Sequence, residues 1–143
     1  APGRKPGKQK KERYIPRPLL FLSTDGFQLF VGKNNRQNDH LTIKMAREDD
    51  IWLHAKDIPG AHVIIRTDGK EVPPATLLEA AVLAALFSRS GKSKNVPVDY
   101  TLKKHVHKPN GAKPGMVIYE HQRTIIASPD EELPERLSPP QQD

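Results

Sequence analysis

One apolar segment constrains the fold of this chain more than any other. Residues 75–87 read ATLLEAAVLAALF, and Glu79 is the only charged residue among them. The preceding Pro73-Pro74 suits the first turn of a helix, and the segment is rich in strong helix formers. We therefore expect one long helix, ended near Gly91, that is buried around most of its circumference. The rest of the domain must pack around it.

Length and composition indicate one soluble domain. The chain has 143 residues, of which 36% are hydrophobic and 28% are charged, as is usual for a globular protein. Its apolar runs are far shorter than the roughly 20 residues of a membrane-spanning helix, so no membrane partner is expected. Because the chain contains no Cys, disulfide scaffolds, cysteine-ligated zinc and thiol catalysis are excluded. The absence of Cys is also compatible with a location in the cytoplasm.

The net charge of +6 is distributed unevenly. Residues 1–15 are rich in Lys and Arg and lack an apolar pattern, which predicts a flexible basic arm or linker. Such an arm either connects domains or adds phosphate contacts. Residues 130–143 form an acidic, Pro-containing tail, also expected to be flexible. The compact domain is expected to span residues 16–129. Its Lys and Arg residues outnumber its Asp and Glu residues, and this net positive charge favours a polyanionic partner.

Short apolar runs predict a largely antiparallel sheet. Leu19–Ser23 and Phe27–Val31 flank Thr24-Asp25-Gly26, which is typical of a hairpin. Ile51–Ala55 and His62–Arg66 flank a second turn, in which Pro59-Gly60 fits type II geometry with a positive φ at Gly60. Further strands are expected at Val98–His107, Met116–Tyr119 and Thr124–Ala127.

A shorter helix is expected over Arg36–Ala46, with Asn34 or Asn35 as its N-cap. Alternation of Leu41, Ile43 and Met45 also permits a strand there, although the helix is favoured. The predicted class is therefore α+β, with antiparallel hairpins packed on one long buried helix and a shorter helix.

Polar side chains are concentrated around the only Trp of the chain. The stretches are VGKNNRQNDHLT at 31–42 and DIWLHAKDIPGAHVII at 50–65. Alternation places Trp52, His54 and Lys56 on one side of a strand, and His62 could lie close to His54 across the hairpin. Amide, imidazole and cationic groups suit hydrogen bonding to phosphate, sugar and base edges better than bond-making chemistry.

These two stretches, together with YTLKKHVHKPNGAKPGMVIYEHQRTIIASP at 100–129, resemble the C-terminal RNA-binding domain of the NFACT family, also called the fibronectin-binding protein A family. The resemblance implies a cytoplasmic ribosome-associated quality-control factor that binds stalled large ribosomal subunits carrying peptidyl-tRNA and supports C-terminal alanine tailing. The implied partners are large-subunit RNA, tRNA and other domains of the same parent protein. The same family also implies an alternative, a fibronectin-binding adhesin domain at the cell surface.

The residues themselves favour binding over catalysis, because no nucleophile, metal set or phosphate cradle has the spacing of a known reaction class. His54 and His62 lack a third ligand at suitable spacing, so a hydrogen-bonding role is favoured over a metal pair. Asp49-Asp50 fits solvated loop acids better than paired catalytic acids. GKS at 91–93 lacks the spacing of a phosphate-binding loop. The prediction is a noncatalytic domain without cofactor or metal.

Each candidate RNA contact has a structural alternative. The block from Asn34 through Gln37 to Asn38 could grip sugar and phosphate or brace a loop. Trp52 could stack on a base, although a lone Trp is more often a core anchor. The later lysines could form a basic stripe or only a solvated face. The hypothesis assigns RNA binding to Lys33, Asn34, Asn35, Arg36, Asn38, Trp52, His54, Lys56, His62, Lys103, Lys104, Lys108, Lys113 and Arg123.

Overall fold

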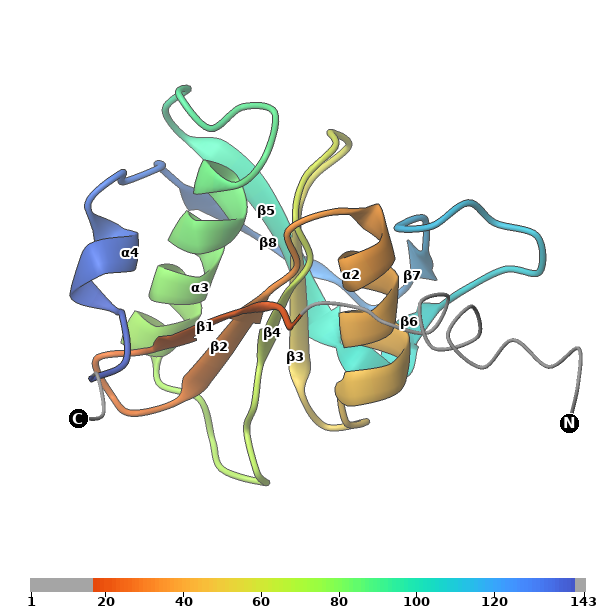
Figure 1. Cartoon of the computed structure of the whole chain (residues 1–143), viewed down its shortest axis with the longest axis horizontal. Coiled ribbons are helices and arrows are strands. Elements are labelled where there is room, and N and C mark those ends of the chain that lie inside the picture. The colour runs from red at the N-terminus through yellow and green to blue at the C-terminus, as the bar shows by residue number, and fades with distance from the viewer. Residues whose placement is uncertain (1–16, 141–143) are drawn as a thin grey trace, which may run out of the picture.

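A six-stranded antiparallel sheet, ordered β1-β2-β4-β3-β5-β8, divides the molecule into two sides. The computed structural model describes residues 17–140. Helix α3 (Pro74–Leu86) and the short α4 (Leu133–Arg136) cover one face, and α2 (Asn35–Asp39) covers the other (Figure 1). The predicted α+β class is confirmed. The strands of the sheet are β1 Leu19–Leu22, β2 Gln28–Val31, β3 Ile51–Ala55, β4 Val63–Ile65, β5 Val96–Leu102 and β8 Arg123–Ala127.

Helix α3 fills the larger core, as predicted. Its small residues at 80, 81, 84 and 85 are buried and let the helix lie close to the sheet, where Leu53, Val63 and Ile65 meet it. The predicted stop at Gly91 is wrong, because the helix ends at Leu86 with Phe87 as its C-cap. A Cβ at Gly91 would lie 2.4 Å from the Leu86 carbonyl oxygen. The glycine therefore allows the loop after α3 to pass close to the last turn of the helix.

The opposite face of the sheet carries a second, smaller core. Leu41, Trp52, Ile64 and Val106 are its buried members. The predicted helix over 36–46 is confirmed as α2 followed by η1 (His40–Met45), which has π-helical geometry. The Asn34 side chain caps α2 by accepting a hydrogen bond from the Gln37 backbone N at 2.9 Å.

Both predicted hairpins form, but the second has a different turn. Strands β3 and β4 pair antiparallel, with Leu53 opposite Val63. The positive φ in their connection belongs to Asp57, at 58°, and not to Gly60 as a type II turn requires. Gly60 instead forms a β-bridge to Ser88 and passes so close that a Cβ would lie 3.0 Å from the Ser88 Cβ. Contact with the end of α3 therefore determines this connection.

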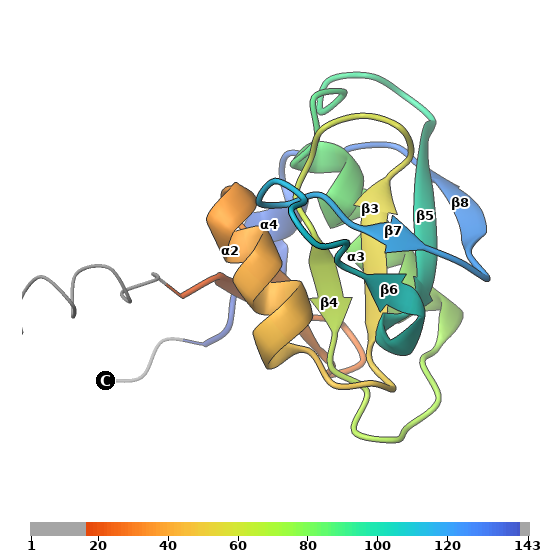
Figure 2. The ribbon, with the colours of Figure 1, turned by 90° about the vertical axis from the view of Figure 1, so that its right-hand side faces the viewer.

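The strand predicted over Val98–His107 is broken into two strands. β5 ends at Leu102, a 3-10 turn η2 follows at Lys103–His105, and β6 (Val106–His107) pairs with β7 (Ile118–Tyr119) in a separate small sheet. The Lys103 N donates to the Asp50 O at 2.8 Å and the Lys104 N to the Glu48 O at 3.2 Å, so the chain bends around the entry to β3. Figure 2 shows β6 and β7 in front of β3.

The expectation of a flexible tail from Asp130 onward is wrong for residues 130–140. Leu133 and Leu137, one helical turn apart, are each only 5% exposed and belong to the α3 core. The Leu22 N also donates to the Leu137 O at 2.8 Å, which ties this segment to β1. The basic arm predicted at 1–15 lies outside the described residues. Among residues 17–140, no helix combines the length and the apolar character that crossing a membrane requires.

Candidate nucleic-acid interface

A groove of about 360 Å³ lies between α2–η1 and the loop that joins β6 to β7. Arg36, His40 and Lys44 follow one another at intervals of four residues, so they share one face of the continuous helix. We call the hollow the α2 groove. It is lined by Arg36, Asp39, His40, Ile43, Lys44, Lys108 and Pro114.

The α2 groove is positively charged because its single carboxylate is already paired. Asp39 Oδ1 lies 3.2 Å from Lys108 Nζ and accepts a hydrogen bond from the Gly115 N at 2.8 Å. The same ammonium group donates to the Met116 O at 3.1 Å and to the Lys113 O. Lys108 therefore holds the loop against α2. Within residues 17–140 no ion pair engages Arg36 or Lys44, so both can neutralise phosphate.

Two further hollows adjoin the first turn of α2. One, of about 600 Å³, is lined by Lys33, Asn34, Asn35 and Arg89 among others. The other, of about 520 Å³, is lined by residues that include Asn35, His54, His62 and Pro114, and we call it the histidine pocket. Asn35 belongs to both hollows, and Pro114 belongs to the histidine pocket and the α2 groove. The three hollows therefore adjoin one another and form one continuous surface around α2.

Gly115 brings the loop close enough to α2 to complete this surface. Its φ is +85°, a conformation that L side chains rarely adopt, and a Cβ there would lie 2.9 Å from Asn35 Oδ1. Its carbonyl oxygen also accepts a hydrogen bond from the His62 ring at 3.1 Å. Asn35 and His62, far apart in the sequence, are thereby joined through one glycine.

His62 supports the surface from inside and is almost fully buried at the base of the histidine pocket. The side chain is 1% exposed, and Trp52 Nε1 donates to its Nδ1 at 3.1 Å. Because indole can only donate, Nδ1 is unprotonated, and Nε2 carries the proton that it gives to the Gly115 O. Burial, with a smaller effect from His54, lowers the pKa of His62 to about 3. His62 is therefore a neutral brace, and the prediction that it contacts RNA is wrong.

Trp52 and Asn38 are likewise structural. Trp52 is 0% exposed, so its ring cannot stack on a base, and the core-anchor alternative is correct. Asn38 is buried, and its Oδ1 accepts from the His62 N at 3.1 Å while its Nδ2 donates to the Gly60 O at 3.5 Å. The amide of Asn38 joins α2 to the β3–β4 connection and to β4, and Trp52 packs with Leu41 of η1 in the smaller core. Their assignment as RNA contacts is wrong.

His54 lies close to His62, as predicted, and remains accessible. The ring centroids are 5.4 Å apart, and the His54 ring stacks on Trp52 at 5.8 Å with an interplanar angle of 2°. Burial lowers the pKa of His54, so the neutral imidazole is favoured. Both ring nitrogens of His62 are hydrogen bonded within the protein, which leaves no donor atom for a His54–His62 metal pair.

The predicted basic stripe is narrower than expected, because several cations are paired. Lys103 lies 3.2 Å from Glu48, and Lys56 lies 3.7 Å from the buried Asp99. Lys113 is exposed and precedes Pro114 at the α2 groove. Two more predicted cations belong to other elements, Lys104 to η2 and Arg123 to the start of β8. Phosphate binding by these exposed cations stays a prediction.

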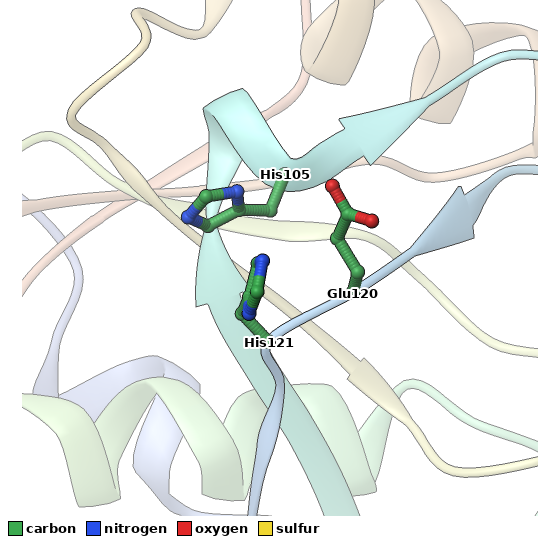
Figure 3. Close-up of side chains that lie close together, drawn as sticks. All are labelled: His105, Glu120 and His121. Atoms are coloured by element: carbon green, nitrogen blue, oxygen red, sulfur yellow. The ribbon is translucent and has the colours of Figure 1, made fainter.

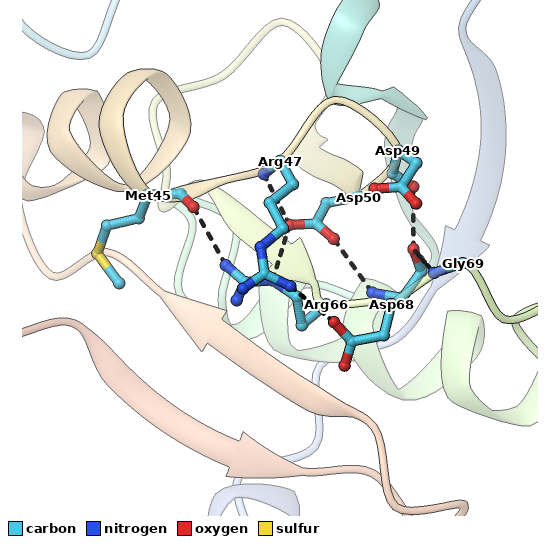
Figure 4. Close-up of polar contacts among 8 residues, drawn as sticks. Met45, Arg47, Asp49, Asp50, Arg66, Asp68 and Gly69 are labelled. Atoms are coloured by element: carbon cyan, nitrogen blue, oxygen red, sulfur yellow. Dashed lines mark hydrogen bonds and ion pairs between the residues drawn. The ribbon is translucent and has the colours of Figure 1, made fainter.

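Asp50 is not a solvated loop acid. It is 0% exposed, and its carboxylate accepts hydrogen bonds from Arg66 Nε at 3.0 Å, the Arg47 N at 2.9 Å and the Thr67 N at 3.1 Å (Figure 4). Arg66 also donates to the Met45 O at 3.1 Å, so this network joins the end of η1 to β4. Both carboxylate oxygens of Asp50 are engaged within the fold, whereas Asp49 is exposed.

Sequence reasoning missed three residues of this surface, one imidazole and two cations. His40 and Lys44 line the α2 groove, and Arg89 lines the hollow beside Lys33. The four-residue spacing from Arg36 would have revealed the first two once the helix was accepted. Arg89 carries no such local signal, because it is placed by contacts between the end of α3 and the β3–β4 connection, among them the hydrogen bond from its N to the Pro59 O at 2.9 Å.

Fold and surface together define the class of this chain: an α+β domain with a hollowed, cationic face around a short helix. Residues 17–121 match the family model described as NFACT protein RNA binding domain, and the chain belongs to this family. The resemblance seen in the sequence is thereby confirmed.

Relatives of the chain occur in bacteria and archaea. The chain is 50% identical over 129 residues to the Rqc2 homolog RqcH of Bacillus subtilis (strain 168), covering 90% of this chain and 22% of that protein. It is 37% identical over 86 residues to the archaeal Rqc2 homolog aRqcH of Methanocaldococcus jannaschii, covering 59% of this chain and 13% of that protein. The chain thus spans less than a quarter of the length of these relatives.

A solved structure has the same fold. The C-terminal part of the fibronectin/fibrinogen-binding protein from Streptococcus suis superposes with a TM-score of 0.83 at 44% sequence identity. The match covers 88% of this chain and 51% of that chain.

Proposed function

We propose that this domain binds RNA, without catalysing a reaction, through the surface around α2. The observation that carries the proposal is the alignment of Arg36, His40 and Lys44 over a groove whose only carboxylate is already paired with Lys108. Lys33 and Asn35 extend the same surface across the first turn of the helix. Cations neutralise phosphates while neighbouring amides hydrogen bond to sugar and base edges.

The hollowed shape of the surface favours single-stranded or looped RNA over a regular duplex. Unpaired bases can enter pockets and use their hydrogen-bonding edges, whereas an A-form helix presents mainly its backbone. The histidine pocket, with His54 at its edge and exposed Met116 on its rim, offers both a polar and an apolar contact to such a base.

The proposed setting is the cytoplasm, in a ribosome quality-control factor. Relatives named Rqc2 homolog and the family match support a role in which the parent protein binds stalled large ribosomal subunits carrying peptidyl-tRNA and supports alanine tailing. Within that parent, the domain would supply contacts to large-subunit RNA or tRNA, and other domains of the same protein would carry the remaining activity.

Fluorescence anisotropy with a labelled tRNA tests the proposal. The double variant Arg36→Ala/Lys44→Ala removes two cations of the groove that form no ion pair within residues 17–140, and it should weaken binding at least tenfold. Each lost phosphate contact should also lower the slope of log affinity against log salt by about 0.7 to 0.9. The matched control is Lys92→Ala/Lys94→Ala, which removes the same charge from the exposed loop after α3. Equal losses in both double variants would contradict the proposal.

A second candidate function is fibronectin binding at the cell surface, which the name of the Streptococcus suis protein favours. Its discriminating measurement is fibronectin binding by the same variants at low and high salt. Binding that survives high salt and the Arg36→Ala/Lys44→Ala change would establish a separate adhesin surface. Fibronectin binding that is lost at high salt and is also lost in the Arg36→Ala/Lys44→Ala variant would reflect only the positive charge around α2.

A further inference from the structure

A cluster of metal-binding side chains lies away from the α2 groove, beside the small β6–β7 sheet. His105 comes from the η2 turn, and Glu120 and His121 directly follow β7 (Figure 3). One potential ligand atom from each of the three residues lies within 4.8 Å of the others. None of these residues belongs to the hollows around α2.

The backbone brings the three residues together and keeps them there. The Glu120 N donates to the His105 O at 3.2 Å, which extends the β6–β7 pairing by one step. Thr101 Oγ1 donates to the Glu120 O at 2.9 Å and anchors the same peptide to β5. The ligand-bearing segments are therefore fixed on two sides, as a preorganised site requires.

The ring arrangement suits a shared ion. The imidazole centroids of His105 and His121 are 4.6 Å apart, with an interplanar angle of 62°. In tetrahedral zinc sites with bonds of about 2.0 to 2.1 Å, ligand atoms lie about 3.3 to 3.5 Å apart, so small side-chain rotations would close this set. His121 has a positive φ of 60°, an uncommon conformation for a non-glycine residue, and its ring lies beside that of His105 (Figure 3).

A third histidine lies beside the carboxylate. His107 Nε2 lies 3.5 Å from Glu120 Oε2. It comes from β6, whereas Glu120 follows the paired strand β7. A small rotation would let this imidazole hydrogen bond to the carboxylate, and such a neighbour fixes the direction of a ligand and raises metal affinity.

We propose that His105, Glu120 and His121 form a site for a Zn²⁺ ion, with three protein ligands and an open fourth position. Two imidazoles and one carboxylate are a ligand set that zinc accepts. The bound ion would join the β7–β8 connection to η2, and so fasten the small sheet over the core that contains Trp52. His107 acts as a positioning residue through Glu120.

The test is isothermal titration of the full 143-residue chain with ZnCl₂ at pH 7.5, together with thermal unfolding. We expect one ion per chain and an unfolding temperature several degrees higher with zinc. His105→Ala, Glu120→Gln and His121→Asn should each weaken binding by more than about 100-fold, whereas His107→Ala should cost about 10- to 100-fold. Asparagine is used at 121 because it tolerates positive φ. Circular dichroism checks that each variant folds.

His40→Ala is the matched control, because His40 lies at the α2 groove and should leave zinc affinity unchanged. Zinc affinity that is the same in wild type, His105→Ala and His121→Asn would mean adventitious binding and would overturn the proposal. A loss in the His40 variant equal to that in the His105 variant would also overturn it. The RNA-binding variants should bind zinc as the wild type does, so failure of this proposal is distinct from failure of RNA binding.

Discussion

Replacing Asp50 with asparagine removes one buried charge while it keeps the shape of the side chain. In the native protein Oδ2 accepts from Arg66 Nε and the Arg47 N, and Oδ1 accepts from the Thr67 N. The NH₂ group of an asparagine would have to take the place of Oδ1 or Oδ2, and in either place it would face N–H groups that need an acceptor. Arg66, whose side chain is only 14% exposed, would also lose its counter-charge.

The expected loss is large, because removing one partner of a buried ion pair leaves the other uncompensated. Such changes destabilise by about 3 to 5 kcal/mol. Asp68→Asn is the matched control in the same region, because the Arg47–Asp68 pair is exposed at 61% and 60%. Exposed pairs contribute about 0 to 1 kcal/mol, so the two variants should differ by at least about 2 kcal/mol.

Urea unfolding, followed by the fluorescence of the single buried Trp52, measures both free energies. A shift of the midpoint at constant slope would report a change in stability alone. If Asp50→Asn cost less than about 1 kcal/mol, the network would not support the fold as a buried ion pair does, and the inference that it fastens η1 to β4 would be refuted.

Three further changes test other parts of the structure. Gly60→Ala should cost about 1 to 3 kcal/mol, because its Cβ would press on Ser88; an unchanged unfolding temperature would contradict the close approach. Leu137→Ala should cost about 2 to 5 kcal/mol, whereas a flexible tail would tolerate it without effect in the same unfolding experiment. His62 should remain neutral in NMR titrations from pH 8 to pH 4.5, because its folded pKa is about 3 against an ordinary value of 6.5. Between pH 3 and pH 6.5 the unfolded chain therefore binds more protons at this histidine than the folded chain does. The free energy of unfolding should fall by up to about 1.4 kcal/mol per pH unit as the pH decreases below 6.5. Protonation of His62 near pH 6 in the folded protein would contradict its role as a buried neutral brace.

Local patterns predicted most of the fold. The Pro-initiated apolar run became α3, and the paired apolar runs became the β1–β2 and β3–β4 hairpins. Each of these depends on neighbours in sequence, so composition and periodicity carry the information. The class of the fold followed from them.

The errors occurred where distant contacts decide the structure. The bend at Lys103 depends on the backbone oxygen atoms of Glu48 and Asp50, more than fifty positions earlier. The packing of 130–140 depends on Leu133 and Leu137 reaching α3 from an otherwise polar segment. No local pattern around these positions reports such contacts.

Only part of the candidate site could be predicted from the sequence, and the reason is similar. Asn35 and Asn38 are the same residue type three positions apart, yet Asn35 is exposed and lines two hollows, whereas Asn38 is 3% exposed, lines only one of them and packs against Gly32 and Gly60. The amide groups that can grip RNA are also those that brace loops, so sequence alone could not separate them. The exposed fractions in the structure separate them, and they also show that Trp52 and His62 are buried rather than on the surface.

NMR mapping of the domain with a short single-stranded RNA tests the central claim most directly. We predict that backbone amide signals of residues 33–44 and 113–117 shift together on titration, with little change at α4 or in the loop around Lys92. Shifts confined to α4, to β8 or to the Lys92 loop, with α2 unaffected, would show that RNA binds elsewhere and would contradict the proposed interface.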